Sequence, residues 1–100
     1  MNIFHKFPVL CDLDGVVWLA HEPIDGSAHA IERLRASGHR VLFVTNNSSA
    51  TVADQEAALS KVGIPAVGDV ITSAMAGAHL LSAGERVLMC GGPGLAEAIA

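Results

Sequence analysis

The chain has 100 residues, of which 51% are hydrophobic and 16% are charged, so it has enough apolar material for one folded domain and lacks the composition of a disordered segment. Six basic and ten acidic residues give a net charge of −4 without any basic cluster, which argues against nucleic-acid binding. No apolar run approaches the roughly 20 residues of a membrane span, and the N-terminus lacks the apolar stretch of a secretory signal. We expect a cytoplasmic protein with neither nucleic-acid nor membrane partners.

The first predicted strand covers residues 9–13 and leads into a pair of carboxylates, Asp12 and Asp14. Its apolar run is typical of a strand covered on both faces. Because residues i and i+2 of an extended chain point to the same side, the carboxylates can converge where the strand ends, and Gly15 lets the backbone turn away. Like charges this close repel unless a cation or a shared proton holds them. Alone, the pair fits either a magnesium-assisted phosphoryl-transfer site or, more commonly, a solvated turn.

The segment after these carboxylates predicts a flap and a helix. Residues 16–19 fit a short extended flap or a buried loop, with Trp18 packed into the core. A helix is predicted over 27–37, capped by Ser27 and ended by Gly38. Glycine is common at this position because it adopts the left-handed conformation that closes a helix.

The second predicted strand, residues 41–44, runs into five small polar residues, 45–49. A plain polar loop is the ordinary interpretation of such a stretch. Its hydroxyl and amide groups would also suit an anion such as phosphate, helped by the positive end of the following helix. That helix is predicted to follow a cap at about Thr51 and to end near residue 62.

The rest of the chain predicts two more strand–helix units. The expected elements are a strand over 69–72, a helix over 73–83 capped by Ser73, a strand over 86–90, a tight glycine-rich turn over 91–94 and a helix over 95–100. Cys11 and Cys90 each fall in a predicted strand and show no C-x-x-C spacing, so we expect buried free thiols.

The alternation of strands and helices predicts the α/β class: a Rossmann-like, mostly parallel sheet with flanking helices and right-handed crossovers. Ligands of such sheets bind beyond the carboxyl ends of the strands. The carboxylates at 12–14 and the polar residues at 45–49 follow successive strands, so both should lie at this edge. Their complementary chemistry at one edge favours a phosphate site over two unrelated loops.

Five motifs together resemble the haloacid dehalogenase superfamily and, more narrowly, its NagD-like branch, which includes phosphoglycolate and nitrophenyl phosphatases. They are Asp12-Leu13-Asp14-Gly15-Val16, Ile24-Asp25-Gly26, Phe43-Val44-Thr45-Asn46-Asn47-Ser48-Ser49, Thr72-Ser73-Ala74 and Gly91-Gly92-Pro93-Gly94-Leu95. The resemblance covers almost the whole chain, and the combination of Asp-x-Asp-Gly with Thr-Asn-Asn is specific.

The resemblance implies a Mg²⁺-dependent phosphatase that hydrolyses small phosphorylated metabolites. Asp12 would be the nucleophile that forms an aspartyl-phosphate, and Asp14 the general acid and base. The Asp12 carboxylate and the Asp14 backbone carbonyl would hold Mg²⁺. The groups that would bind the phosphoryl oxygens are the side chains of Thr45, Asn46 and Asn47 and the backbone N–H of Leu13.

The family pattern also predicts that residues 1–100 are the N-terminal part of a core domain. A cap domain, a phosphate-binding Lys and a Gly-Asp pair that completes the metal site are expected further along the chain of such proteins and are not found here. We therefore expect this piece to be inactive alone. The strand that carries the later Asp neighbours the first strand in the family, so an apolar sheet edge is expected there.

A different class of function fits the same carboxylates. The chain would then be a non-catalytic α/β module that binds phosphate or a partner protein, or a receiver-like domain phosphorylated on Asp12. Receiver domains need a third acidic residue and a distant Lys, and the polar motif at 45–47 is not theirs.

Overall fold

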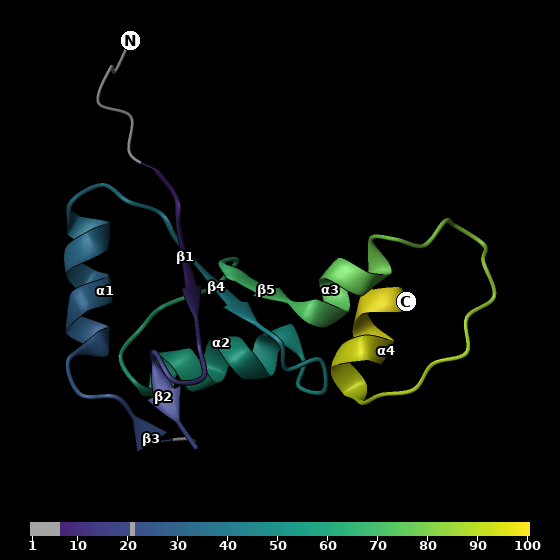
Figure 1. The fold of residues 1–100 in the computed structure, drawn as a ribbon, viewed down its shortest axis with the longest axis horizontal. Coiled ribbons are helices and arrows are strands. Elements are labelled where there is room, and N and C mark those ends of the chain that lie inside the picture. Colours follow the sequence, from purple (N-terminus) through teal and green to yellow (C-terminus); the bar gives the residue numbers. More distant parts are fainter. Residues whose placement is uncertain (1–6, 21) are drawn as a thin grey trace, which may run out of the picture.

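The computed structural model describes residues 7–20 and 22–100. The sheet strands are β1 (Val9–Asp12), β4 (Val41–Thr45) and β5 (Val70–Thr72), and a hairpin joins β2 (Trp18–Leu19) to β3 (Glu22–Pro23). The helices are α1 (Ser27–Ala36), α2 (Val52–Lys61), α3 (Ser73–Ala78) and α4 (Pro93–Ile99) (Figure 1). The sheet is parallel in the order β1-β4-β5, which confirms the predicted α/β class.

The two crossover helices cover the same face of the sheet. Ile31 of α1 and Leu59 of α2 share one hydrophobic core with Phe43 of β4, whose side chain is fully buried. The two crossovers step in the same direction along the sheet, so right-handed connections place both helices on one side. The other members of this core are Leu13, Val17, Trp18, Val41, Ile64, Ala66 and Val70.

The opposite face of the sheet is open in the described part of the chain. Leu10 of β1 is 68% exposed, so the prediction that this strand is covered on both faces is wrong for these residues. The continuous apolar run reflects a strand with two apolar faces, but the described helices cover only one of them. The predicted apolar edge is present, because β1 is the outer strand and Phe7 beside it is 77% exposed.

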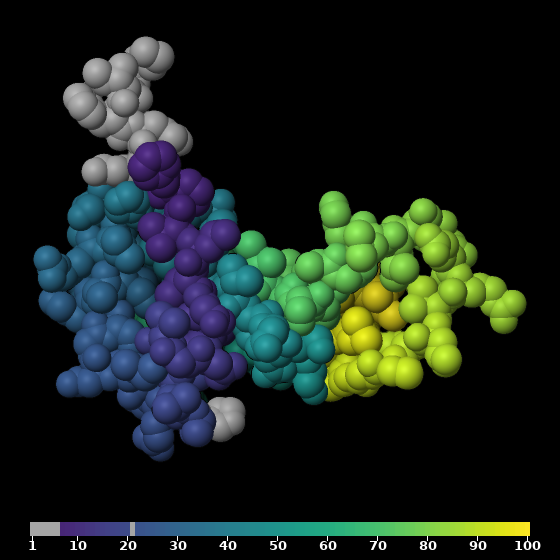
Figure 2. All heavy atoms as spheres, in the orientation of Figure 1, coloured from purple at the N-terminus to yellow at the C-terminus, as the bar shows by residue number. Residues whose placement is uncertain are grey.

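One-sided packing and an extended arm together give the molecule its shape. It measures 44 × 40 × 18 Å, and its radius of gyration of 15.4 Å exceeds the roughly 13 Å of a compact 100-residue domain. Figure 2 shows an arm, made of α3, α4 and the segment between them, that extends away from the sheet. None of the helices in the described residues has the length and apolar character to cross a membrane.

The predicted strand over 86–90 is wrong, and the helix predicted over 73–83 ends at Ala78. Residues 81–91 instead run as an exposed segment in which Leu88 is 92% exposed. A strand forms only when its backbone N–H and C=O groups pair with a neighbour, and no described strand lies beside this segment. The apolar residues there therefore have a strand composition without a strand structure.

Two predicted helix caps shift by one residue. Gly26, not Ser27, is the N-cap of α1, and the Ser27 hydroxyl donates to the Ile24 carbonyl. Thr72, not Ser73, caps α3 by accepting the N–H of Met75 at 3.2 Å. The predicted Thr51 cap of α2 is confirmed, since its hydroxyl accepts the Asp54 N–H at 3.1 Å.

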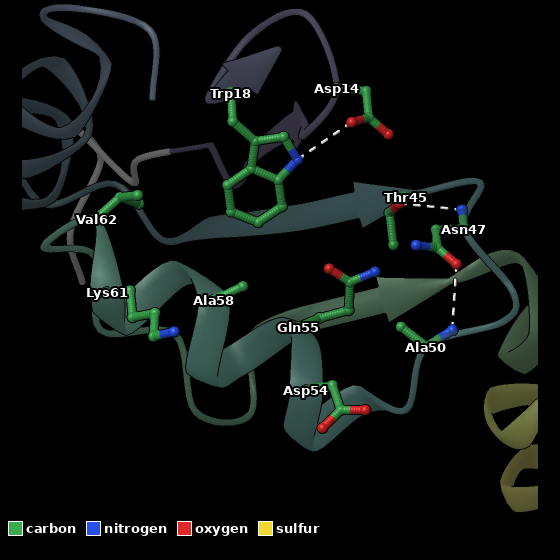
Figure 3. Close-up of a pocket in the computed structure, with 10 residues that line it drawn as sticks. All are labelled: Asp14, Trp18, Thr45, Asn47, Ala50, Asp54, Gln55, Ala58, Lys61 and Val62. Carbon is green, nitrogen blue, oxygen red and sulfur yellow. Dashed lines mark hydrogen bonds between the residues drawn. The ribbon is translucent and has the colours of Figure 1, made fainter. Parts of the chain in front are cut away.

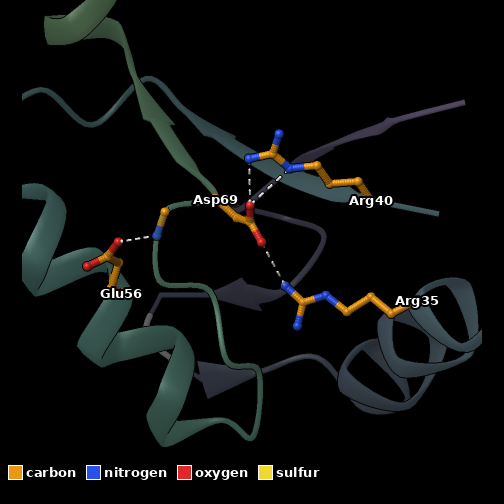
Figure 4. A network of polar contacts seen from close by, with 5 residues as sticks. Arg35, Arg40, Glu56 and Asp69 are labelled. Carbon is orange, nitrogen blue, oxygen red and sulfur yellow. Dashed lines mark hydrogen bonds and ion pairs between the residues drawn. The ribbon is translucent and has the colours of Figure 1, made fainter. Parts of the chain in front are cut away.

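A charged network ties the amino ends of the strands to the helices (Figure 4). Asp69 accepts hydrogen bonds from Arg40 at 3.1 and 3.2 Å and forms an ion pair with Arg35 at 3.5 Å. Glu56 of α2 accepts the N–H of Gly68 at 2.8 Å in the turn before β5. These charges lie at the end of the sheet opposite to Asp12 and Thr45, so we assign them a structural role.

The glycine-rich start of α4 packs against the polar loop, which comprises residues 46–51. The N–H of Gly94 donates to the Ser49 carbonyl at 2.8 Å, and Glu97 accepts the N–H of Val52 at 3.1 Å. A Cβ atom on Gly94 would collide with the backbone carbonyl oxygens of Ser48 and Ala50. Only glycine therefore allows this close approach, which holds the polar loop from the side of α4.

Substitution of this glycine tests the contact. We expect Gly94→Ala to lower the free energy of unfolding by about 1–3 kcal/mol, as overpacking of a tight contact does. Gly77→Ala is the matched control, because no atom lies within 4 Å of the position its Cβ would take in α3. That change should raise the free energy of unfolding by up to about 1 kcal/mol through helix propensity. Urea denaturation followed by Trp18 fluorescence measures both, and equal effects would contradict the close packing.

Candidate active site

The predicted site residues lie together at the carboxyl edge of the sheet. Asp12 ends β1 and pairs in register with Val44, so Thr45 lies one residue further on the adjacent strand. Thr45 pairs in turn with Thr72 at the end of β5. The Ser73 hydroxyl donates to the Asn46 carbonyl at 3.1 Å, which ties the start of α3 to the polar loop. Parallel register therefore brings segments 12–14 and 45–47 to one edge.

The two carboxylates have different surroundings. Asp12 is exposed, and its Oδ1 accepts the N–H of Leu13 at 2.9 Å. Asp14 lies beyond the end of β1, in a turn where Gly15 has a φ of 84°, and its Oδ1 accepts the indole N–H of Trp18 at 3.1 Å. The i, i+2 geometry of an extended strand therefore does not position Asp14. The turn at Gly15 and the hydrogen bond from Trp18 position its side chain.

Leu13 differs in part from its predicted role. Its side chain is 1% exposed and belongs to the core. Its backbone N–H, expected to be available for a phosphoryl oxygen, is engaged by the Asp12 carboxylate. In this arrangement the Leu13 N–H orients the Asp12 carboxylate. To contact a substrate, this N–H would have to donate to a phosphoryl oxygen in place of the Asp12 carboxylate.

The polar loop is organised by its own side chains. The Asn47 N–H donates to the Thr45 hydroxyl at 3.1 Å. The Asn47 side-chain oxygen accepts the N–H groups of Ser49 at 3.0 Å and Ala50 at 3.2 Å. These contacts fix which arm of the amide is the oxygen, and Figure 3 shows the Asn47 amide nitrogen on the side of the cavity. Because the Thr45 hydroxyl accepts one bond, its hydrogen is available to donate another.

A cavity of about 390 Å³ lies between this edge and α2. Asp14, Thr45 and Asn47 line it, and Trp18 forms a wall (Figure 3). The prediction that Trp18 packs in the core is confirmed, since it is 9% exposed, and its indole also faces Asp14. The further lining residues are Ala50, Asp54, Gln55, Ala58, Lys61 and Val62.

Gln55 is a cavity residue that the sequence analysis missed. It is 5% exposed and lies in α2 between the inward-facing positions Val52 and Leu59. The spacing of three and four residues places it on the apolar stripe of the helix. A polar residue on such a stripe is the sequence signal that points to this position.

The chain matches the family of haloacid dehalogenase-like hydrolases over residues 9–100. It belongs to this family. The match includes both carboxylates and the whole polar loop. The predicted family resemblance is therefore confirmed, and membership of a hydrolase family favours an enzyme over the receiver-like alternative.

Individual relatives of this haloacid dehalogenase-like hydrolase are phosphatases. The chain is 40% identical over 97 residues to D-glycerol 3-phosphate phosphatase of Mycobacterium tuberculosis, covering 92% of this chain and 27% of that protein. It is 40% identical over 94 residues to acid sugar phosphatase of Staphylococcus saprophyticus, covering 90% and 36%. The chain thus spans about a third or less of the length of these curated relatives.

Solved structures give the same relationship. The crystal structure of glycerol phosphate phosphatase from M. tuberculosis in complex with magnesium matches with a TM-score of 0.81 and 36% identity, over 95% of this chain and 29% of that one. NagD from Escherichia coli K-12 matches with a TM-score of 0.81 and 26% identity, over 92% and 38%. The fold and the NagD-like branch agree with the prediction.

The oxygen donors at the sheet edge fit part of a magnesium site. Within 7–20 and 22–100, no group of three or more His, Cys, Asp and Glu residues could hold a metal ion. Mg²⁺ is commonly bound by only one or two carboxylates, with water and substrate phosphate as the other ligands. The exposed carboxylate of Asp12 and the backbone carbonyl of Asp14 match that chemistry.

The thiol beside the site differs from the prediction. Cys11 in β1 is half-buried, and Cys90, expected in a strand, is exposed in the unpaired segment. Burial, and then the negative charge of Asp12, raise the pKa of the Cys11 thiol. At pH 8 the fraction of Cys11 present as the reactive thiolate is therefore smaller than that of a thiol with the ordinary pKa.

We expect iodoacetamide at pH 8 to alkylate Cys90 several-fold faster than Cys11, as measured by peptide mass spectrometry. Raising the pH should increase the Cys11 rate, because a larger fraction of its thiol then ionises. Asp12→Asn should also accelerate alkylation of Cys11, since it removes the neighbouring charge that disfavours the thiolate. Equal rates for the two thiols at pH 8 would contradict this account.

Proposed function

We propose that the chain is the N-terminal part of the core domain of a Mg²⁺-dependent phosphatase that acts on small phosphate monoesters through an aspartyl-phosphate. The observation that carries the proposal is the meeting of segments 12–14 and 45–47 at one sheet edge, in a family whose similar members are phosphatases. The cap and the second half of the core would lie outside these 100 residues, and the chain alone would have at most very weak activity.

The nucleophile in this proposal is the Asp12 carboxylate. Its Oδ1 is oriented by the Leu13 N–H at 2.9 Å, and the side chain is exposed to an incoming phosphoryl group. A bond forms between this carboxylate and phosphorus while the bond from phosphorus to the substrate oxygen breaks. Asp14 donates a proton to that leaving oxygen, then accepts one from the water that hydrolyses the aspartyl-phosphate. Phosphate leaves and Asp12 is regenerated.

Neutral donors at the end of β4 and in the polar loop would hold the phosphoryl oxygens. The Thr45 hydroxyl and the Asn47 amide nitrogen supply hydrogen bonds without adding negative charge, and Asn46 lies between them. Phosphoryl transfer depends mainly on such positioning and charge stabilisation. Magnesium, when bound at Asp12 and Asp14, would neutralise charge between an anionic nucleophile and an anionic substrate. The magnesium complex of the M. tuberculosis relative supports this choice of metal.

Replacement of the nucleophile is the direct functional test. In the complete protein, Asp12→Asn should lower the rate of aryl phosphate hydrolysis with Mg²⁺ by about 10⁴-fold, because the amide is a poor nucleophile. Glu32→Gln is the matched control, since it removes an exposed carboxylate on α1 that does not line the cavity. Asp12→Asn with unchanged activity would refute the proposal.

Asn47→Asp separates phosphate binding from loop structure. The new carboxylate keeps an oxygen to accept the N–H groups of Ser49 and Ala50, so the loop should remain folded. It replaces the amide donor with a negative oxygen, so we expect inorganic phosphate to bind at least about tenfold more weakly, the equivalent of one lost charge-assisted hydrogen bond. Thermal unfolding and phosphate inhibition measure the two effects. Unchanged phosphate inhibition would show that Asn47 does not contact the phosphoryl group.

A further inference from the structure

Residues 13–18 form a closed turn around Asp14. The Leu13 carbonyl accepts the Trp18 N–H at 3.3 Å, and the Trp18 carbonyl accepts the Gly15 N–H at 2.7 Å. The backbone of Trp18 is therefore bonded to the residues on both sides of Asp14. The indole N–H adds a third link, because it donates to Oδ1 of Asp14 at 3.1 Å.

Trp18 is the anchored partner of this hydrogen bond. Its side chain is 9% exposed and belongs to the hydrophobic core, and its backbone pairs with Pro23 in the hairpin of β2 and β3. Asp14 is exposed, so its carboxylate lacks such packing. The fixed indole therefore orients the carboxylate, and the carboxylate does not orient the indole.

The hydrogen bond makes the two oxygens of Asp14 different. The indole N–H can only donate, so Oδ1 acts as an acceptor, and a proton on this carboxyl group belongs on Oδ2. In Figure 3 the second oxygen points away from the indole, and Thr45 and Asn47 lie on that side of the ring. The free oxygen of Asp14 therefore faces the groups that would hold the phosphoryl oxygens.

We propose that Trp18 is a positioning residue for proton transfer: its indole N–H holds Oδ1 of Asp14, which leaves Oδ2 as the atom that protonates the leaving group. The inference rests on the proposed phosphatase function, in which Asp14 is the general acid. The bond between Oδ2 and its hydrogen breaks together with the bond from phosphorus to the ester oxygen. The proton passes to that oxygen, which leaves as an alcohol or phenol, and Trp18 itself exchanges no proton.

This role predicts that the effect of Trp18 depends on the basicity of the leaving oxygen. A strongly basic oxygen needs a proton in order to leave, whereas a weakly basic one does not. Phenyl phosphate and p-nitrophenyl phosphate have leaving groups of similar shape, and the nitro group makes the second one a much weaker base. The ratio of their kcat/KM values therefore reports proton transfer.

Trp18→Phe tests the role in the complete protein, because it keeps an aromatic ring and removes the N–H. We expect kcat/KM for phenyl phosphate to fall about tenfold or more, the effect of one lost hydrogen bond to a charged group, and kcat/KM for p-nitrophenyl phosphate to fall less than about threefold. The ratio is independent of the fraction of folded protein, because both substrates are measured on one sample. Ile31→Val trims the same core outside the cavity, so this control should leave the ratio unchanged.

Two further variants separate the N–H from the ring and test the link to Asp14. Replacement of Trp18 by 3-benzothienylalanine, which has nearly the same shape and a sulfur atom in place of the N–H, should change the ratio as Trp18→Phe does. In an Asp14→Asn background, Trp18→Phe should change the ratio no further, because the proton donor is already absent.

The outcomes separate the role of Trp18 from the function. An equal fall for both substrates, an unchanged ratio, or a further change of the ratio in the Asp14→Asn background would overturn the role of Trp18 and leave the phosphatase assignment intact. Absence of Mg²⁺-dependent hydrolysis of both substrates by the unsubstituted protein would overturn the proposed function, and the positioning role with it.

Discussion

The parallel pairing of β1 with β4 is the constraint on which the candidate site depends. Its register sets Asp12 beside Val44 and so places the polar loop directly across from the carboxylates. Neither segment makes a site alone, because a pair of carboxylates after a strand and a run of small polar residues are both common in loops. The core between the strands and the two helices, centred on the fully buried Phe43, stabilises this pairing and with it the juxtaposition.

Neutral hydrogen bonds and close packing, more than charge, organise the polar loop. The Asn47 side chain closes a local turn, and Gly94 approaches the loop closely enough to hydrogen-bond its backbone. The Asn47 amide therefore stabilises the loop through hydrogen bonds within it, and Gly94 of α4 stabilises it through a hydrogen bond from a neighbouring element. The glycine-rich turn is therefore important near the site although it lacks the pattern of a phosphate-binding motif, because it supports the polar loop, which carries Asn47 and follows Thr45.

The elements with local causes were predictable from the sequence. Residues 9–12, 41–45 and 70–72 are apolar runs with turn signals after them, and the Thr51 cap follows from the preference of hydroxyl side chains for helix starts. The segment 86–90 has the same composition as these strands but no neighbour to pair with, so composition alone gave the wrong prediction there. Local sequence predicts the tendency to form a strand, whereas pairing decides the outcome.

The site was predictable in outline and not in detail. Strand order brought Asp12 and Thr45 to one edge, but the position of Asp14 depends on a turn through Gly15 and on an indole four residues away. The proposed mechanism requires that the Asp12 carboxylate accepts the phosphoryl group. Acid quenching of the complete protein during turnover with Mg²⁺, followed by mass spectrometry of its peptides, locates that group. We predict a phosphoryl adduct on the Asp12 carboxylate, and an adduct on any other residue would contradict the account.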